Sequence, residues 1–173
     1  MVALIILLTM ASRPAWGADQ SVLEKQVKSA FVVNFVQFIE WPATAFEKAD
    51  DPVVIGVADS NALGDTLAAA IEGKTVRGRK LVIKQVTAQS AGGCHVLITG
   101  GLDGTDLQTI LKAAGGKPCL TIGDSEHFTE AGGVIRFYVE ERKERFEINV
   151  SAANHARLQI SSKLLKLAKV VNP

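Results

Sequence analysis

Short runs rich in β-branched residues alternate with helix-forming segments as far as residue 124. The strand-like runs PVVIGVAD, RKLVIKQV, CHVLITG and PCLTIGD begin at residues 52, 79, 94 and 118. Helices are expected from Ser21 to the Trp41-Pro42 pair, and over residues 61–73 and 105–116. Strands separated by helices imply right-handed crossovers within a largely parallel sheet. This alternation restricts the chain to an α/β fold.

The pattern changes in the last forty residues. Two alternating runs, GVIRFYVEE and RFEINVS, lie three residues apart and predict an antiparallel hairpin at the sheet edge. One short and one longer helix should follow, over residues 151–171. A chain of 173 residues with 47% hydrophobic residues can bury one core. We therefore expect a single α/β domain: a mostly parallel or mixed six-stranded sheet, flanked by five or six helices and carrying a C-terminal antiparallel hairpin.

The N-terminus resembles an export signal. Residues 2–11 form an apolar run that is too short to span a bilayer, which takes about 20 residues. Pro14 follows, and Ala15 and Gly17 supply small residues for cleavage before Ala18. The pattern predicts a signal peptide over residues 1–17 and a periplasmic mature domain over 18–173. The alternative is a buried N-terminal strand or helix.

The two cysteines predict a disulfide in an oxidising compartment. Cys94 and Cys119 each open a strand-like run, with one helix between them. Neighbouring strands lie about 4.8 Å apart, which is within the Cα separation that a bridge allows. We expect a Cys94–Cys119 disulfide, the alternative being two buried free thiols.

The segment GDSEHFTEAGG, residues 123–133, has the residue types of a hydrolase site. A catalytic triad needs groups that converge from different parts of the fold, whereas Ser125 and His127 are two residues apart in one turn. We therefore expect a capped short helix that ends at Gly132-Gly133, and no catalytic residues. Asp124 and Ser125 remain candidate ligand or partner contacts.

Composition argues against several other functions. The net charge of +1 provides no overall field for nucleic acid. His95, His127 and His155 do not have the spacing of zinc ligands, and no phosphate-binding loop is present in the sequence. We expect no metal, no cofactor and no nucleic-acid partner.

Two further segments are candidate partner contacts. Trp41 and Pro42 follow the phenylalanine stripe of the first helix, and Trp41 is the large apolar residue expected to reach the surface. Lys163 and Lys166 lie on the polar face of the expected C-terminal helix, which could bind a partner or pack with its lysines in solvent.

Three motifs together resemble the YfiR-type family, DUF4154. They are VKSAFVVNFVQFIEWP at 27–42, GDSEHFTEAGGVIRF at 123–137 and RFEINVSAANHARLQISSKLLKLA at 145–168. The resemblance implies a periplasmic, non-catalytic repressor of an inner-membrane diguanylate cyclase, YfiN, that lowers cyclic-di-GMP and biofilm formation. It also implies release by an outer-membrane lipoprotein, YfiB, and leaves a homodimer open.

Two other functions remain open from the residues. A small-ligand-binding or sensor module is one, because Asp59, Ser60, Asp124 and Ser125 follow strand ends where α/β sheets form clefts. A hydrolase that uses Ser125 is the other, which the spacing of the turn disfavours.

Overall fold

The computed structural model describes residues 16–58 and 63–173, with side chains from residue 20 onward. The helices are α1 (Trp16–Phe38), α2 (Gly64–Ile71), α3 (Gly104–Ala114), α4 (Val150–His155) and α5 (Ser162–Leu165). The main strands are β2 (Val53–Val57), β4 (Arg79–Gln85), β5 (Val96–Gly100), β6 (Leu120–Gly123), β7 (Ile135–Glu140) and β8 (Lys143–Asn149). Short strands are β1 (Ile39–Glu40), β3 (Thr75–Val76), β9 (Gln159–Ile160) and β10 (Lys169–Val171). The 3-10 turns are η1 (Ala43–Ala45) and η2 (Ala91–Gly93).

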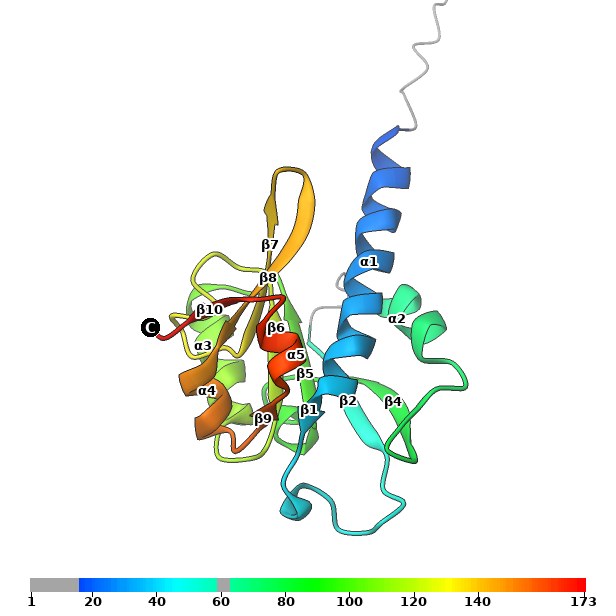
Figure 1. Cartoon of the computed structure of the whole chain (residues 1–173), viewed down its shortest axis with the longest axis vertical. Helices are drawn as coiled ribbons and strands as arrows, with labels where there is room; N and C mark the ends of the chain where they lie inside the picture. Colours follow the sequence, from blue (N-terminus) through cyan, green and yellow to red (C-terminus); the bar gives the residue numbers. More distant parts are fainter. Residues whose placement is uncertain (1–15, 59–62) are drawn as a thin grey trace, which may run out of the picture.

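One eight-stranded mixed sheet organises the chain, in the order β10-β8-β7-β6-β5-β2-β4-β3. Strands β4, β2, β5, β6 and β7 run parallel, and β7 and β8 form the antiparallel hairpin. Helices α1 and α2 lie on one side of the sheet and α3 on the other (Figure 1). The mixed α/β class, the single domain and the C-terminal hairpin are thus confirmed.

The larger core lies between α1 and the sheet. Phe35 of α1 is fully buried and packs against Phe137 of β7 and Phe146 of β8, with ring centroids 5.6 and 4.9 Å apart. Phe31 also contacts both strand residues. The phenylalanine stripe is therefore core, and it fixes α1 across the hairpin strands.

Several details differ from the expectations. The main sheet has eight strands rather than six, because β3 and β10 add short edges. The hairpin is not at the edge, since β10 pairs parallel with β8. Helix α1 ends at Phe38, before Trp41-Pro42, because Ile39 and Glu40 pair with β9.

The longer C-terminal helix is not formed. Its expected span divides into β9, the four-residue α5 and β10. Val170 and Val171 are β-branched, and their pairing with Ile148 and Asn149 of β8 outweighs the local helix preference. Residues 125–132 likewise form successive turns in place of the expected short helix.

No helix among the residues that the structure describes is both long and apolar enough to cross a membrane. The expected signal peptide, residues 1–17, lies almost wholly outside the described residues, as do Asp59 and Ser60.

Candidate functional site

A cleft lies at the carboxyl edge of the parallel strands, beneath α1. Along the chain, β2 is followed by β4 on one side and then by β5 on the other, so the strand order reverses between β2 and β5. Open α/β sheets bind ligands at the carboxyl ends of strands next to such a reversal. Here β5 ends at Gly100, and Asp124 directly follows β6. The hollow measures about 200 Å³, with an apolar floor made by Leu63, Ile98, Ile122 and Phe137.

Lys28 of α1 is the central charge of this cleft. Its Nζ lies 2.8 Å from Glu24 Oε1 and 3.0 Å from Asp124 Oδ2, and only 12% of its side chain is exposed. Burial alone would lower the pKa of Lys28, but its hydrogen bonds to Glu24 and Asp124 outweigh that effect and raise the pKa. Lys28 therefore stays charged and ties α1 to the end of β6.

Glu144 of β8 adds a third carboxylate to the group. Its Oε2 is buried and has no hydrogen-bond partner within the described residues. Burial raises the pKa of Glu144; the Lys28 ammonium opposes this, while the charges of Glu24 and Asp124 add to it. Three carboxylates thus share one buried ammonium, which leaves acceptor oxygens that a bound cation or a hydrogen-bond donor could use.

The turn after β6 is built around Phe128 and not around its polar residues. Phe128 is fully buried. A Cβ added at Gly123 would lie 2.5 Å from the Phe128 ring, and one at Gly133 would meet the same ring. The two glycines therefore form the walls that receive the ring. His127 points to solvent, with its Nδ1 2.9 Å from Glu130, and the buried Oγ of Ser125 has no hydrogen-bond partner in the part of the chain that is described.

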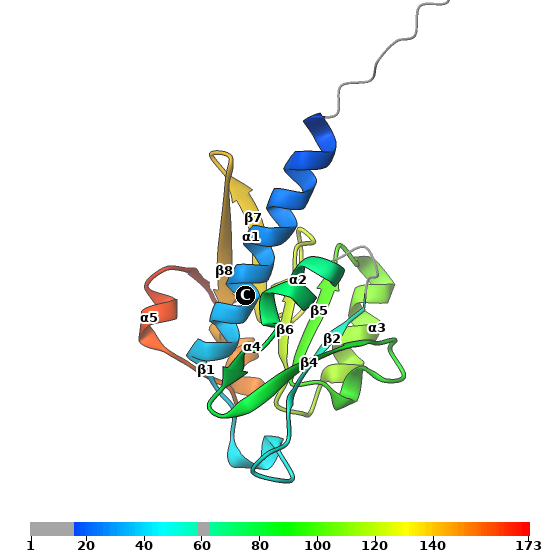
Figure 2. The same cartoon turned by 90° about the vertical axis from the view of Figure 1, so that its right-hand side faces the viewer.

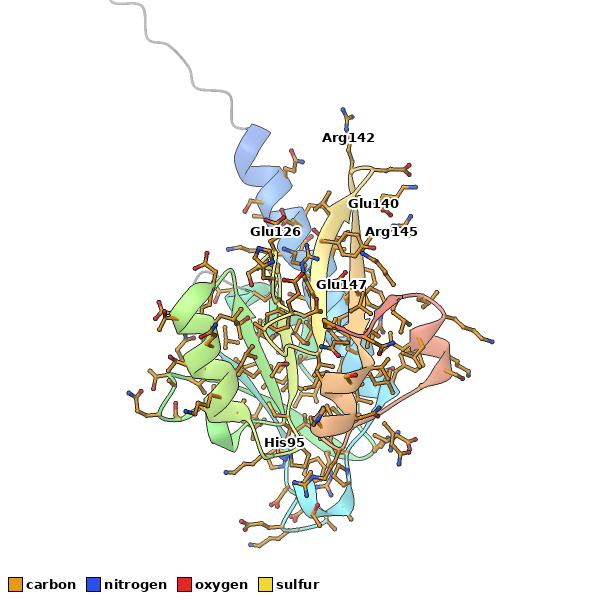
Figure 3. The ribbon with its side chains drawn as sticks, turned by 90° about the vertical axis from the view of Figure 1, so that its left-hand side faces the viewer. His95, Glu126, Glu140, Arg142, Arg145 and Glu147 are labelled. Atoms are coloured by element: carbon orange, nitrogen blue, oxygen red, sulfur yellow. The ribbon has the colours of Figure 1, made fainter. Side chains whose placement is uncertain are left out.

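The turn is held to the hairpin by Glu147, which is labelled in Figure 3. Glu147 Oε1 accepts hydrogen bonds from Thr129 Oγ1 at 2.8 Å and from Arg136 Nη1 at 3.0 Å. Lys169 of β10 lies 3.5 Å from Oε2. Burial would raise the pKa of Glu147, but these partners lower it. One carboxylate therefore joins the turn, β7, β8 and β10.

The family model described as YfiR/HmsC-like, DUF4154, matches residues 25–169. The chain belongs to this YfiR/HmsC-like family. The match includes Lys28, Asp124, Phe128, Glu144 and Glu147, so the turn and all of the cleft except Ser21 and Glu24 lie within the matched range.

The YfiR/HmsC-like chain also matches solved structures. One is the crystal structure of a conserved domain protein from Vibrio cholerae, at 13% identity and a TM-score of 0.55. The match covers 82% of this chain, which spans 59% of the length of the Vibrio protein. This likeness shows the fold. No curated protein matches the chain.

The disulfide expected in this YfiR/HmsC-like chain is not formed, because Cys94 and Cys119 are both free, buried thiols. Strands β5 and β6 are neighbours as predicted, with Val96 opposite Leu120. Both thiols lie in the same small core cluster, packed with residues of β5 and α3, without being bonded to each other. Burial raises the pKa of both thiols, most strongly that of Cys119, so both stay protonated.

The remaining predicted residues are spread over the molecule. Trp41 and Pro42 are half-buried, and the Trp41 indole donates a hydrogen bond to the His95 carbonyl oxygen at 3.2 Å. Lys163 and Lys166 are exposed; Lys163 lies within the short α5 and Lys166 directly follows it. Among the predicted residues that the structure describes, Asp124 is the one that lines the carboxyl-edge cleft.

Sequence reasoning missed Lys28 and Glu144. A lysine three residues before Phe31 on an apolar helix face is a signal that could have drawn attention to Lys28. Glu144 lies among other charged hairpin residues, and nothing in the sequence separates it from them.

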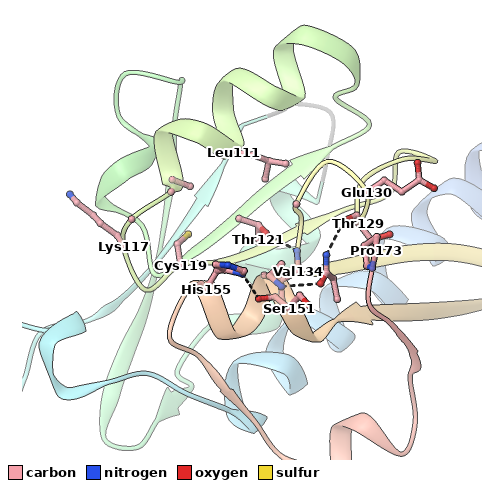
Figure 4. A pocket seen from close by; sticks show the side chains of 17 residues that line it. Leu111, Lys117, Cys119, Thr121, Thr129, Glu130, Val134, Ser151, His155 and Pro173 are labelled. Atoms are coloured by element: carbon pink, nitrogen blue, oxygen red, sulfur yellow. Dashed lines mark hydrogen bonds between the residues drawn. The ribbon is translucent and has the colours of Figure 1, made fainter.

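A second hollow lies between α3, α4 and the turn after β6, and Figure 4 shows it from close by. It measures about 340 Å³, with Cys119 among its lining residues. Several of its polar groups already bond within the fold. Thr121 Oγ1 accepts from the Val134 amide, and Asn149 Nδ2 donates to the Thr129 carbonyl, both at 2.9 Å. These bonds fix the hollow's polar wall to the turn.

Proposed function

We propose that the chain is a periplasmic regulator that represses an inner-membrane diguanylate cyclase of the YfiN kind by binding its periplasmic part. Membership of the YfiR/HmsC-like family is the observation that carries this proposal, since the family is consistent with regulation of cyclic-di-GMP signalling. The protein acts by binding and not by catalysis. By favouring one state of the cyclase it shifts the population away from the active state.

The proposed cyclase-binding surface comprises the first half of α1 and the β7–β8 hairpin. Both extend beyond the body of the molecule at the same end (Figures 1 and 2). Large apolar side chains are exposed there: Val22, Leu23 and Val27 on α1, and Val139 on β7. Charged hairpin residues surround Val139, including Glu140, Arg142 and Arg145 (Figure 3). Exposed apolar groups within a charged border are typical of interaction surfaces.

The deciding experiment is deletion of the gene followed by measurement of cellular cyclic-di-GMP. We expect the level to rise, and wild-type protein supplied in trans to restore it. Leu23→Glu should fail to restore the level, because it places a charge on the proposed surface. Leu167→Glu is the matched control, since Leu167 is also exposed but lies beyond α5. An unchanged level after deletion would refute repression.

The complementation also tests the other candidate contacts. Failure of Leu167→Glu, or of Lys163→Glu with Lys166→Glu, alongside success of Leu23→Glu would move the interface to the α5 region. Asp124 and Ser125 belong to the α1 side, because Asp124 pairs with Lys28. Trp41 and Pro42 are proposed as secondary contacts.

Export and release complete the proposal. Residues 1–17 act as a signal peptide and deliver the domain of residues 18–173 to the periplasm. N-terminal sequencing of protein from the periplasmic fraction should begin at Ala18. An outer-membrane lipoprotein of the YfiB kind competes for the regulator and frees the cyclase by mass action.

A small-ligand-binding module is the alternative function, and the carboxyl-edge cleft favours it. A hollow of about 200 Å³ with an apolar floor and the Lys28–Asp124 pair could hold a small polar molecule. A panel of small metabolites should then raise the melting temperature of wild-type protein and leave that of Asp124→Asn unchanged. A flat panel with the wild-type protein would count against this function.

A further inference from the structure

His95 lies at the amino edge of the sheet, far from the projecting hairpin (Figure 3). Both ring nitrogens are occupied. Nδ1 lies 3.0 Å from the Val54 amide nitrogen, which can only donate, so Nδ1 accepts. Nε2 lies 3.0 Å from the Ala45 carbonyl oxygen, which can only accept, so Nε2 carries the proton. The two bonds therefore fix the neutral imidazole in one tautomer.

The ring also holds the loop of residues 41–52 through stacking. Phe46 lies parallel to the His95 ring, with centroids 4.4 Å apart and planes 13° apart. The Arg79 guanidinium lies 3.7 Å from the Phe46 centroid. Two planar groups at these distances cannot share one face of the ring, so Phe46 lies between Arg79 and His95. The backbone oxygen of His95 accepts from Trp41 as well.

Protonation of His95 disrupts this arrangement at one defined contact. A second ring proton would sit on Nδ1 and point at the Val54 N–H, so a hydrogen bond would become a contact between two donors. The new positive charge would also be separated from the Arg79 guanidinium only by the Phe46 ring. Relief of this contact requires the ring to turn, which carries Nε2 away from the Ala45 oxygen and the ring face away from Phe46, so the loop loses both contacts.

The surrounding charges do not remove the conflict. Asp51 attracts the charged ring, but its Oδ2 already accepts from the amides of Glu47 and Lys48, at 2.9 and 2.8 Å. Arg79 repels the charged ring. The other titratable or charged groups that line the same hollow of about 790 Å³ are Glu47, Lys84, Cys94, Lys117 and Arg157.

We propose that His95 is a pH-sensitive anchor, which holds residues 41–46 of the loop against the sheet when the ring is neutral and releases them when the ring is protonated. The Arg79 guanidinium donates hydrogen bonds to the Lys48 and Asp51 carbonyl oxygens, and these bonds hold the far end of the loop at any ring charge. The hollow of about 790 Å³ lies beneath the loop residues Thr44, Ala45, Glu47 and Asp51, so release opens the amino edge of β2 and β5 to solvent. The importance of this anchor for signalling rests on the proposed periplasmic location. The anchor itself is a property of the purified protein and can fail or succeed independently.

The direction of the pH dependence follows from the ring's environment. Burial lowers the pKa of His95 below its ordinary 6.5; the Ala45 bond opposes this and Arg79 adds to it. Below pH 6.5 the released state therefore binds a proton that the anchored state does not. The ratio of released to anchored molecules rises by up to tenfold per pH unit as the pH falls from 6.5 to the lowered value.

The experiment measures the fluorescence of Trp41, whose indole donates a hydrogen bond to the His95 carbonyl oxygen. The Trp16→Phe variant serves as the parent protein, because it leaves Trp41 as the one tryptophan. Acrylamide quenching of Trp41 should rise as the pH falls from 7.5 to 5. His127→Gln, which removes an exposed histidine, is the matched control and should behave as the parent does. His95→Asn should lose the pH dependence. Quenching that stays constant over this range in the parent would overturn the proposal.

A second measurement covers the case in which His95→Asn does not fold. The ring carbons of the three histidines are followed by NMR in the parent protein as the pH is lowered. We expect His95 to titrate below 6.5, together with a loss of protection of the Val54 amide against hydrogen exchange. Titration of the His95 ring at or above 6.5, or a protected Val54 amide beside a charged ring, would refute the anchor.

Discussion

The Phe128 ring and Gly133 should be strongly coupled in stability. Phe128→Ala removes a fully buried ring and should lower the free energy of unfolding by about 3–5 kcal/mol. Gly133→Ala places a methyl group 2.5 Å from Phe128 Cζ, and overpacking of this kind costs about 1–3 kcal/mol or more. Gly133 does not have a positive φ, so its backbone accepts alanine.

The two substitutions together should cost less than their sum. Once the ring is gone, the methyl group introduced at position 133 occupies vacated space, and glycine-to-alanine replacement can even stabilise by about 0.4–1 kcal/mol. We expect a favourable coupling of about 2 kcal/mol between the two sites. Urea denaturation of the two single variants, the double variant and the wild-type protein measures it.

Gly132→Ala provides the matched control. Gly132 has φ +95° and nothing within 4 Å of an added Cβ, so its cost is backbone strain of about 1–2 kcal/mol. That cost should add to the cost of Phe128→Ala without coupling. If Gly133→Ala and Phe128→Ala were also additive, to within about 0.5 kcal/mol, the glycines would not be required by the ring.

Three further predictions concern the charges and the thiols. Lys28→Met should destabilise the protein more at pH 7 than at pH 5 in urea denaturation, because burial raises the pKa of Glu144 and its ionised carboxylate then lacks the Lys28 cation; equal losses would contradict the central role of Lys28. Glu147→Gln should cost about 1–3 kcal/mol at pH 7. Because the folded-state pKa of Glu147 is lowered, its contribution is complete above 4.5 and is lost as the pH falls further, so the wild type and the variant should converge in acid. Without reductant, thiol labelling should find no reactive cysteine in native protein and two after denaturation, whereas none after denaturation would indicate a bridge.

The sequence was most informative where one local pattern also decided the tertiary role. Phe31 and Phe35 follow helical spacing, and their burial against the sheet agrees with it. The alternation of strands and helices was sufficient for the parallel strands β2, β5 and β6. The prediction of a longer C-terminal helix was wrong. The leucines and lysines of this segment have helical spacing, but Val170 and Val171 pair with β8, and local spacing does not reveal a partner strand.

The carboxyl-edge cleft was only partly predictable. Asp124 was expected at a strand end, and it is there. Its ion pair with Lys28 joins residues 96 positions apart, and the approach of Glu144 depends on how the hairpin folds over α1. The disulfide was predicted from the adjacency of the two strands, which is confirmed, but adjacency alone does not fix where the two sulfur atoms lie.

The two ends of the main sheet bear on how the protein can meet other chains. Its outermost strands within the described residues are β3 and β10, of two and three residues. Strand β3 pairs only with Arg79 and Lys80 of β4, and β10 pairs only with residues 147–149 of β8. Residues 81–85 of β4 and 143–146 of β8 therefore keep backbone amides and carbonyls without a strand partner on their outer side, within the described residues. Another polypeptide that adds a strand to this sheet can therefore do so along four or five residues at each end, and recognition over the rest of the surface depends on side chains.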